Sequence, residues 1–241
     1  MRYFIELSYN GKKYHGWQIQ PDAVSVQEKL NDAVSTILQE KIEVVGAGRT
    51  DTGVHASQMF AHFNVENSIA GDVVHKLNSI LPNDITVYKV FSVEEEQHAR
   101  FHALSRSYEY RIWLGRNPFL LDFSWQIHSQ KLDIFKMNEA AKILLEYEDF
   151  QTFSKVKTEV YTFNCDVTAA FWKQEGNLLT FYISANRFLR NMVRAIVGTL
   201  VDVGLGKISI NDFRQIIESK NRGNAGLSVP AKGLFLTQIK Y

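Results

Sequence analysis

The order of hydrophobic patterns in the N-terminal part of the chain is the feature that most constrains the fold. A strand-like run over residues 3–9 precedes a helical pattern that starts at Ser25, where Ser25 and Glu28 form a capping box. The next patterns predict two strands, a helix and a further strand, at residues 42–45, 58–65, 72–80 and 85–91. This order, strand–helix–strand–strand–helix–strand, is typical of a ferredoxin-like (RRM-like) α+β fold.

The C-terminal part of the sequence shows a similar alternation. Side chains alternate over residues 108–114, which predicts a strand. The later patterns predict a strand, a helix, two strands, two helices and a last strand, at residues 125–128, 134–147, 165–173, 178–185, 187–201, 210–219 and 234–240. We therefore expect two α+β halves, residues 1–105 and 106–241.

Composition bounds the class of protein. With 241 residues, of which 45% are hydrophobic, the chain can bury the core of one large domain or two small ones. A net charge of +1 is weak support for nucleic-acid binding, so a basic surface has to come from local clusters. The single cysteine, Cys165, is expected to be a reduced core residue, which fits the cytoplasm. Without a zinc pattern, a signal peptide or an apolar run near the about 18 residues of a membrane helix, the protein is expected to be soluble.

The octapeptide at residues 48–55 has the composition of an active-site loop. It lies between two predicted strands, and Gly48 and Gly53 permit a positive φ or the close approach of another molecule. Arg49 could pair with the Asp51 carboxylate, which would favour its ionised and nucleophilic form. The simpler alternative is a turn in which Asp51 bonds its own backbone and Arg49 is solvated.

The sequence Arg-Thr-Asp-Thr-Gly-Val-His at residues 49–55 resembles the signature of the tRNA pseudouridine synthases of the TruA family. Further segments match that family in the same order along nearly the whole chain. They are residues 9–11, 14–18, 25–28, 81–82, 98–103, 106–110, 149–153, 186–194 and 233–236. One such match is weak, whereas this many in order make a strong resemblance.

The resemblance has two departures and one competing interpretation. Thr52 stands where the family more often has Ala, and Ser107 where a basic residue is common, but neither replaces a group that the chemistry needs. Thr52 also completes Asp-Thr-Gly, the short signature of aspartic proteases. Those enzymes need two carboxylates that share one proton, a state which the nearby Arg49 would oppose. An aspartic hydrolase is therefore a remote alternative.

The resemblance implies an isomerase that converts uridine to pseudouridine in the anticodon stem-loop of tRNAs, at positions 38, 39 and 40. The uracil is detached at N1 and reattached through C5 without net redox change, so no cofactor and no metal are expected. The family also implies base flipping, a homodimer, and one extended mixed, mainly antiparallel sheet shared by the two halves, with a central active-site cleft.

Two residues would carry the chemistry. The aspartate of the family signature is the nucleophile, and it corresponds to Asp51. Tyr108 matches the tyrosine that stacks on the target base and is the candidate acceptor of the C5 proton. Without the resemblance, an aromatic residue on a strand is more often part of the core than of a site.

The predicted helix over residues 187–201 carries a third residue assigned to the chemistry. Arg187, Asn191 and Arg194 recur at helical spacing, so we expect them to share one face of that helix. The resemblance pairs Arg194 with Asp51. A surface arginine bonded to Asp202 or to solvent is the simpler alternative.

The remaining matched residues are assigned to RNA. Arg100 would lie at the mouth of the cleft and displace the flipped nucleotide, because chemistry on a stacked base requires extrusion. The structural alternative makes Phe101 core and Arg100 exposed. The residues assigned to RNA or substrate contact are Arg49, Arg100, Arg187, Arg190 and Leu234. His55, His62 and His98 lack a metal-ligand spacing and are expected to be structural.

A non-catalytic RNA-binding protein on the same fold is the main alternative of a different class. Its recognition of a folded RNA arm would rest on shape and backbone contacts. Loss of Asp51, Tyr108 or Arg194 would favour it, and all three residues are present.

Overall fold

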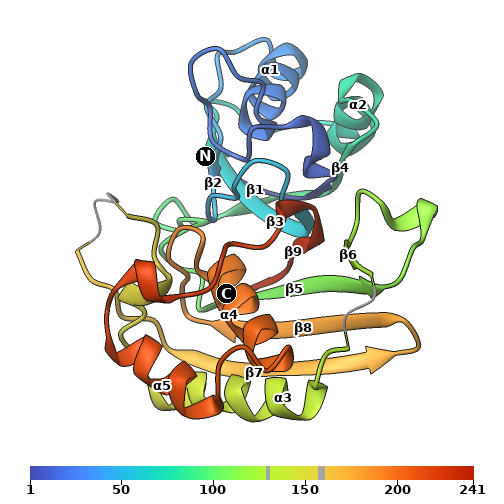
Figure 1. The fold of residues 1–241 in the computed structure, drawn as a ribbon. Helices are drawn as coiled ribbons and strands as arrows, with labels where there is room; N and C mark the ends of the chain where they lie inside the picture. Colours follow the sequence, from blue (N-terminus) through green and yellow to red (C-terminus); the bar gives the residue numbers. More distant parts are fainter. Residues whose placement is uncertain (129–130, 157–160) are drawn as a thin grey trace. The chain divides into compact units, whose positions relative to one another are not determined.

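The structure, a computed structural model, describes residues 1–128, 131–156 and 161–241 (Figure 1). These residues form five α-helices and nine β-strands, which confirms the predicted α+β class. They group into two compact units: Met1–Leu104 with Phe235–Tyr241, and Ser105–Leu234. No helix within the described ranges is long and apolar enough to cross a membrane.

The sheet of the first unit has the strand order β4–β1–β3–β9. β1 is antiparallel to both β4 and β3, and β9 joins β3 in parallel, with His55 opposite Phe235. The short β2 pairs with another part of β3. The strands are β1 (Arg2–Tyr9), β2 (Val45–Gly46), β3 (His55–Asn64), β4 (Ile85–Val93) and β9 (Leu234–Lys240). Because β3 starts at His55, its pairing with β9 fixes the chain directly after the Asp51 loop.

Two helices complete the first unit and contact each other (Figure 1). α1 (Val26–Leu38) begins at the predicted capping box, in which the Ser25 hydroxyl accepts the Glu28 N–H and the Glu28 carboxylate accepts the Ser25 N–H. α2 (Val73–Ile80) is capped by the Asp72 side chain and packs on β4. Helix α1 therefore starts at the predicted cap, and α2 starts within one residue of the range predicted for it, 72–80.

The strand predicted over residues 42–45 is wrong for its first three residues, since only β2 pairs with β3. Ile42 and Val44 are buried, as the strand-like hydrophobic pattern indicated. Their N–H groups, however, donate to Ser35 Oγ and Asn31 Oδ1 of α1. Side chains of the helix thus satisfy backbone groups that a partner strand would otherwise bind.

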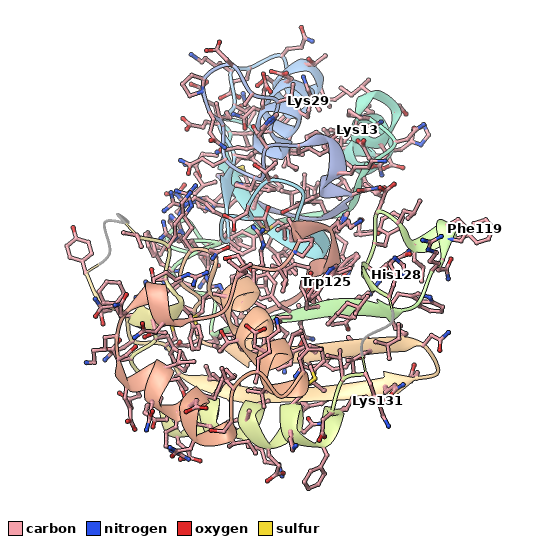
Figure 2. The ribbon with its side chains drawn as sticks, viewed as in Figure 1. Lys13, Lys29, Phe119, Trp125, His128 and Lys131 are labelled. Atoms are coloured by element: carbon pink, nitrogen blue, oxygen red, sulfur yellow. The ribbon has the colours of Figure 1, made fainter. Side chains whose placement is uncertain are left out.

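The sheet of the second unit has the strand order β5–β8–β7, and both pairs are antiparallel. β6 pairs with the end of β5 in parallel. The strands are β5 (Ser105–Leu114), β6 (Trp125–Ile127), β7 (Val167–Glu175) and β8 (Leu178–Ala185). The helices α3 (Ile134–Ile143), α4 (Met192–Gly204) and α5 (Ile210–Glu218) contact one another, and α3 also contacts β7. Phe119, between β5 and β6, is 87% exposed and projects from the unit (Figure 2).

Short 3₁₀ helices occupy several connections. They lie at Gly11–Lys13, Pro118–Leu120, Leu144–Glu146, Gln151–Phe153, Arg222–Asn224 and Ala231–Gly233. One of them ends the helix predicted over residues 134–147, because the α-helical part stops at Ile143.

Helix α4 begins at Met192, later than the pattern over residues 187–201 predicted. Asn191 has a left-handed backbone with φ 67°, which separates the helix from the preceding loop. Arg187 and Asn191 thus precede the helix, and the prediction that they share a helical face with Arg194 is wrong. The apolar side chains within α4 are buried as expected.

The C-terminal residues 235–241 group with the first unit, whereas the sequence placed them in the second half. Besides the pairing of β9 with β3, the Tyr241 ring packs on Phe4 and Phe60, with centroids 5.3 Å apart in each case. The Tyr241 hydroxyl donates to Ala99 O at 2.7 Å. Pairing between residues so far apart in the chain has no local signal, which is why periodicity grouped the strand with its sequence neighbours.

Candidate active site

Asp51 lies in a tight turn immediately before β3. The Val54 N–H donates to Asp51 O at 3.1 Å, and Gly53 within the turn has φ 77°. The preceding residue, Thr50, is buried, and its hydroxyl is hydrogen bonded to Tyr9 Oη at 2.8 Å. The Asp51 side chain itself is half-buried. The turn therefore presents this carboxylate from a backbone that is anchored on both sides.

The matched segment at residues 9–18 packs directly on this turn. The Gly53 N–H donates to Tyr14 O at 3.2 Å. The Trp17 N–H donates to Thr50 O, also at 3.2 Å. Two backbone hydrogen bonds from one segment thus bracket Asp51.

Two glycines permit this approach. A Cβ on Gly11 would lie 1.9 Å from Val54 O. A Cβ on Gly16, which has φ 89°, would lie 2.2 Å from Thr50 O. The backbone of the segment thus lies directly against the backbone of the turn. Because a side chain at either position would collide with the turn, both residues have to be glycine.

Tyr14 anchors the segment on its other side. Its hydroxyl donates to Asp84 Oδ1 at 2.5 Å, and Lys13 Nζ lies 3.4 Å from Asp84 Oδ2. Burial raises the pKa of Tyr14 and the Asp84 carboxylate raises it further, so the phenol stays protonated at neutral pH. The Lys13 side chain is largely exposed at the surface of this unit (Figure 2). The hydrogen bond between Tyr14 and Asp84 therefore persists across the neutral range.

Arg49 lies exposed on the same turn. Its Nη1 donates to Gln18 Oε1 at 3.1 Å. Gln18 follows Trp17, whose ring lies so close to Gly46 that a Cβ there would be 2.4 Å from it. The Arg49 guanidinium thus lies at the surface of the turn.

Arg100 and Phe101 form an exposed tip on a turn that histidines stabilise. Phe101 is 73% exposed, and Arg100 Cζ lies 5.6 Å from the centroid of its ring. His98 Nδ1 accepts the N–H groups of Arg100 and Phe101, and His62 Nδ1 accepts that of Ala99. Burial lowers the pKa of His98, and lowers that of His62 to about 4, so both rings are neutral acceptors at neutral pH. The structural alternative that placed Phe101 in the core is wrong.

In the second unit, Tyr108 and Tyr110 lie two residues apart on β5 but differ in their surroundings. Tyr110 is fully buried, and its hydroxyl donates to Pro230 O at 2.8 Å. Tyr108 is half-buried, and its ring meets that of Phe188 edge-on, with centroids 5.1 Å apart. Tyr108 is therefore the one of the two that another molecule can reach.

Arg194 is half-buried in the first turn of α4. Its Nε donates to Val229 O at 2.7 Å, and the Val229 N–H donates to Arg194 O at 3.3 Å. In the loop before α4, Arg187 is half-buried and Arg190 is exposed. Leu234 at the start of β9 is buried, with 6% of its surface exposed. Of these residues, Arg190 is the most accessible to a ligand.

Known proteins resemble the chain over its whole length. A family model described as tRNA pseudouridine synthase matches residues 140–241. A tRNA pseudouridine synthase A from Bacteroides fragilis is 52% identical, over 100% of the chain and 96% of that protein. Those from Parabacteroides distasonis and Bacillus licheniformis are 50% and 40% identical, over 100% of the chain and 96% and 99% of their own lengths. The chain belongs to the tRNA pseudouridine synthase A family.

Membership of the tRNA pseudouridine synthase A family confirms the resemblance found in the sequence. This is a family of isomerases that act on tRNA uridine, which does not support the aspartic hydrolase alternative. Asp51 lies in the first unit with Arg49 and Arg100. The other predicted site residues lie in the second unit, and they are Tyr108, Arg187, Arg190, Arg194 and Leu234. Roles that join residues of the two units remain predictions.

Other residues that support the predicted site were not found from the sequence. Asp84 bonds Tyr14, and Arg222 and Ser228 are hydrogen bonded to each other in the segment that leads to Val229. None of the three has a spacing in this sequence that points to Asp51 or Arg194. Only the folded chain brings them to their partners.

Proposed function

We propose that this protein isomerises uridine to pseudouridine on the 3′ side of the anticodon arm of tRNA. The observation that supports this most directly is the Asp51 turn, a signature carboxylate on a backbone that Gly11 and Gly16 hold by direct contact. A catalytic group has to be held within about 0.5 Å of its productive position. A turn locked by backbone contacts meets that requirement.

In this reaction the bond between uracil N1 and ribose C1′ breaks, and a bond between C5 and C1′ forms. C5 loses a proton and N1 gains one, so atoms and electrons balance without a redox partner. Asp51 acts as the nucleophile: its carboxylate bonds to ribose C1′ or to uracil C6, and that temporary bond breaks again once the bond between C5 and C1′ has formed. Tyr108 stacks on the base and accepts the C5 proton, a role that its half-buried ring beside Phe188 supports.

Arg194 pairs with Asp51 and keeps its carboxylate ionised. The hydrogen bond from Arg194 Nε to Val229 O fixes the plane of the guanidinium for this role. Removing the arginine would raise the pKa of the carboxyl group. The acidic limb of the pH profile of kcat/KM should therefore move to higher pH in Arg194→Ala, whereas an unmoved limb would remove Arg194 from this role.

Binding of tRNA rests on arginines and on the exposed tip at Phe101. The proposed phosphate contacts are Arg49, Arg187 and Arg190. Arg100 displaces the flipped nucleotide, and its stacking with Phe101 presents a flat cationic surface to the opened base stack. Leu234, which is buried, belongs to the apolar wall behind the base.

The role of Arg100 has its own test. Arg100→Ala should slow the modification of a stem uridine more than that of a loop uridine, because unstacking costs more in the stem. Single-turnover rates on two tRNAs that differ in the position of the target uridine measure this. Equal slowing of both would count against displacement of the nucleotide.

The working form is proposed to be a cytoplasmic homodimer. With a net charge of only +1, two copies that present their arginines to one tRNA would supply more positive charge along the polyanion than one copy does. Light scattering on the purified protein should give twice the chain mass of 27.7 kDa. A single-chain mass at working concentration would contradict the dimer.

The alternative function is RNA binding without catalysis. Asp51, Tyr108 and Arg194 are all present, which favours the enzyme. The deciding measurement is tritium release from tRNA labelled at uracil C5, with no cofactor added. Wild type and Asp32→Asn, which alters an exposed carboxylate residue of α1, should both release tritium, and Asp51→Ala should not. No release by wild type from any tRNA it binds would favour the non-catalytic alternative.

A further inference from the structure

The segment Ala225 to Val229 lies directly on helix α4. A Cβ on Gly198 of the helix would lie 1.9 Å from Leu227 O, and a Cβ on Gly226 would lie 2.8 Å from the backbone nitrogen of Thr199. The Gly226 N–H donates to Thr199 Oγ1 at 2.9 Å. Since backbone meets backbone at both glycines, the segment has little freedom to move along the helix.

Arg222 binds the same segment with its guanidinium. Nη1 donates to Ala225 O at 3.3 Å and to Gly226 O at 3.1 Å. Nη2 donates to Ser228 Oγ at 2.9 Å. Burial lowers the pKa of Arg222, but an arginine remains charged at neutral pH, so all three bonds are charge-assisted. A lysine has no planar fork with which to make them together.

Ser228 connects this segment to the start of α4. Its Oγ also accepts a hydrogen bond from Asn191 Nδ2 at 2.6 Å. Asn191 is the left-handed residue directly before α4, which begins at Met192. One hydroxyl oxygen therefore joins Arg222, the segment and the end of the helix that carries Arg194.

The next residue, Val229, exchanges two hydrogen bonds with Arg194, from Arg194 Nε to Val229 O and from Val229 N to Arg194 O. We propose that Arg222, acting through Ser228, is a positioning residue that sets the direction of the Arg194 guanidinium. This inference rests on the proposed role of Arg194 towards Asp51. Arg222 itself contacts neither the substrate nor the carboxylate in this assignment.

A displaced guanidinium should reduce turnover more than binding. A shift of about 1 Å in a catalytic group costs up to about 100-fold in rate. Ser228→Ala removes the oxygen that accepts from both Arg222 and Asn191, whereas Ser228→Thr keeps a hydroxyl. The expected result for Ser228→Ala is a loss of about 10-fold or more in kcat with KM within a few-fold, and an acidic limb moved to higher pH.

The matched variants separate positioning from mere stability. Arg222→Lys should resemble Ser228→Ala, Ser228→Thr should recover most of the rate, and Arg214→Lys should keep it. Arg214 also makes charge-assisted bonds in this unit, to Glu146 and Tyr147. Thermal unfolding of each variant shows whether it is folded at the assay temperature.

Two outcomes would overturn the inference. One is an unchanged kcat in folded Ser228→Ala and Arg222→Lys; the other is a fall in kcat with no movement of the pH limb. Both are read against Arg194→Ala. If Arg194→Ala itself keeps full activity, the proposed role of Arg194 is wrong. If Arg194→Ala is inactive while Ser228→Ala and Arg222→Lys keep normal activity, only the positioning role of Arg222 is wrong.

Discussion

The Asp51 turn and the Arg194 side chain are held in place in different ways. The turn is fixed by backbone contacts, with Gly11 and Gly16 of one segment pressed against its carbonyl groups. Arg194 is oriented by a hydrogen-bonded segment in which the side chains of Arg222 and Ser228 take part.

This difference has a consequence for what substitutions do. A turn held by close backbone contact fails as a whole, because any added Cβ collides with a main-chain atom that is itself part of the fold. A side chain held through a polar network loses its direction while the fold remains. Damage to the first region should therefore appear in stability, and damage to the second in turnover.

The largest effect is expected for the carboxylate itself. Asp51→Asn keeps the size of the side chain and leaves the backbone contacts of the turn in place. Turnover should fall below detection, while tRNA affinity in a filter-binding assay stays within several-fold and the melting temperature is little changed. Weakened binding with normal turnover would take Asp51 out of the chemistry.

Of the glycines that pack on the Asp51 turn, Gly16 should be the most damaging to replace with alanine. Its Cβ would lie 2.2 Å from Thr50 O, and its φ of 89° disfavours any side chain. We expect a loss of about 3 kcal/mol or more in the free energy of unfolding, from collision and left-handed strain together. Urea unfolding followed by circular dichroism measures the loss.

Gly71→Ala is the matched control for that substitution. Gly71 has a similar φ of 75°, but a Cβ there would meet no atom within 4 Å. It should cost about 1 kcal/mol, the strain alone. Equal losses at Gly16 and Gly71 would show that close backbone contact does not hold the turn.

Gly198→Ala tests the second region in the same way. Alanine raises helix propensity by about 1 kcal/mol, but the Cβ would lie 1.9 Å from Leu227 O and push the segment off α4. We expect a moderate loss of stability and about a 10-fold loss in kcat as the Val229 carbonyl moves. Gly204→Ala, whose Cβ would lie closest to the flexible Met137 side chain, 2.5 Å from its sulfur, should keep kcat. An unchanged kcat in Gly198→Ala would contradict the expectation that damage to the segment beside Arg194 lowers turnover.

The smallest effect is expected at the turn that carries Arg100. Burial lowers the pKa of His62 to about 4, so the unfolded chain binds a proton that the folded chain excludes between about pH 6.5 and 4. The free energy of unfolding should therefore decrease as the pH falls through that window. His62→Asn keeps an acceptor for the Ala99 N–H and does not titrate, so its unfolding should depend less on pH. Identical pH dependence of the two proteins would show that His62 contributes nothing to it.

Local signals predicted the parts of the fold that local physics decides. The capping box at Ser25 starts α1 as expected, since the side chain that caps the helix lies next to its first turn in the sequence. The hydrophobic pattern at residues 42–44 predicts a strand, although side chains of α1 and not a partner strand accept the N–H groups of Ile42 and Val44. The periodicity of hydrophobic residues indicates which side chains are buried, but not which group binds the backbone N–H.

In the predicted site, too, the sequence revealed local features and missed those that depend on tertiary contacts. The motif around Asp51 was visible in the sequence, and Gly53 has the positive φ that a glycine there permits, whereas a Cβ on Gly48 would meet no atom within 4 Å. The helical face assigned to Arg187 and Arg194 was wrong, because the left-handed Asn191 interrupts the pattern and no hydrophobic spacing reveals a single φ. Arg222 is brought to its role by tertiary contacts alone.

The buried indole of Trp17 gives the Asp51 turn a built-in optical reporter. The ring is 2% exposed, lies against Gly46 and is 6.2 Å from the ring of Tyr9, while its backbone N–H bonds Thr50 O. The remaining tryptophans, Trp113, Trp125 and Trp172, all belong to the second unit. With those three replaced by phenylalanine, emission from the single remaining indole would follow the turn beside Asp51 as tRNA arrives and leaves.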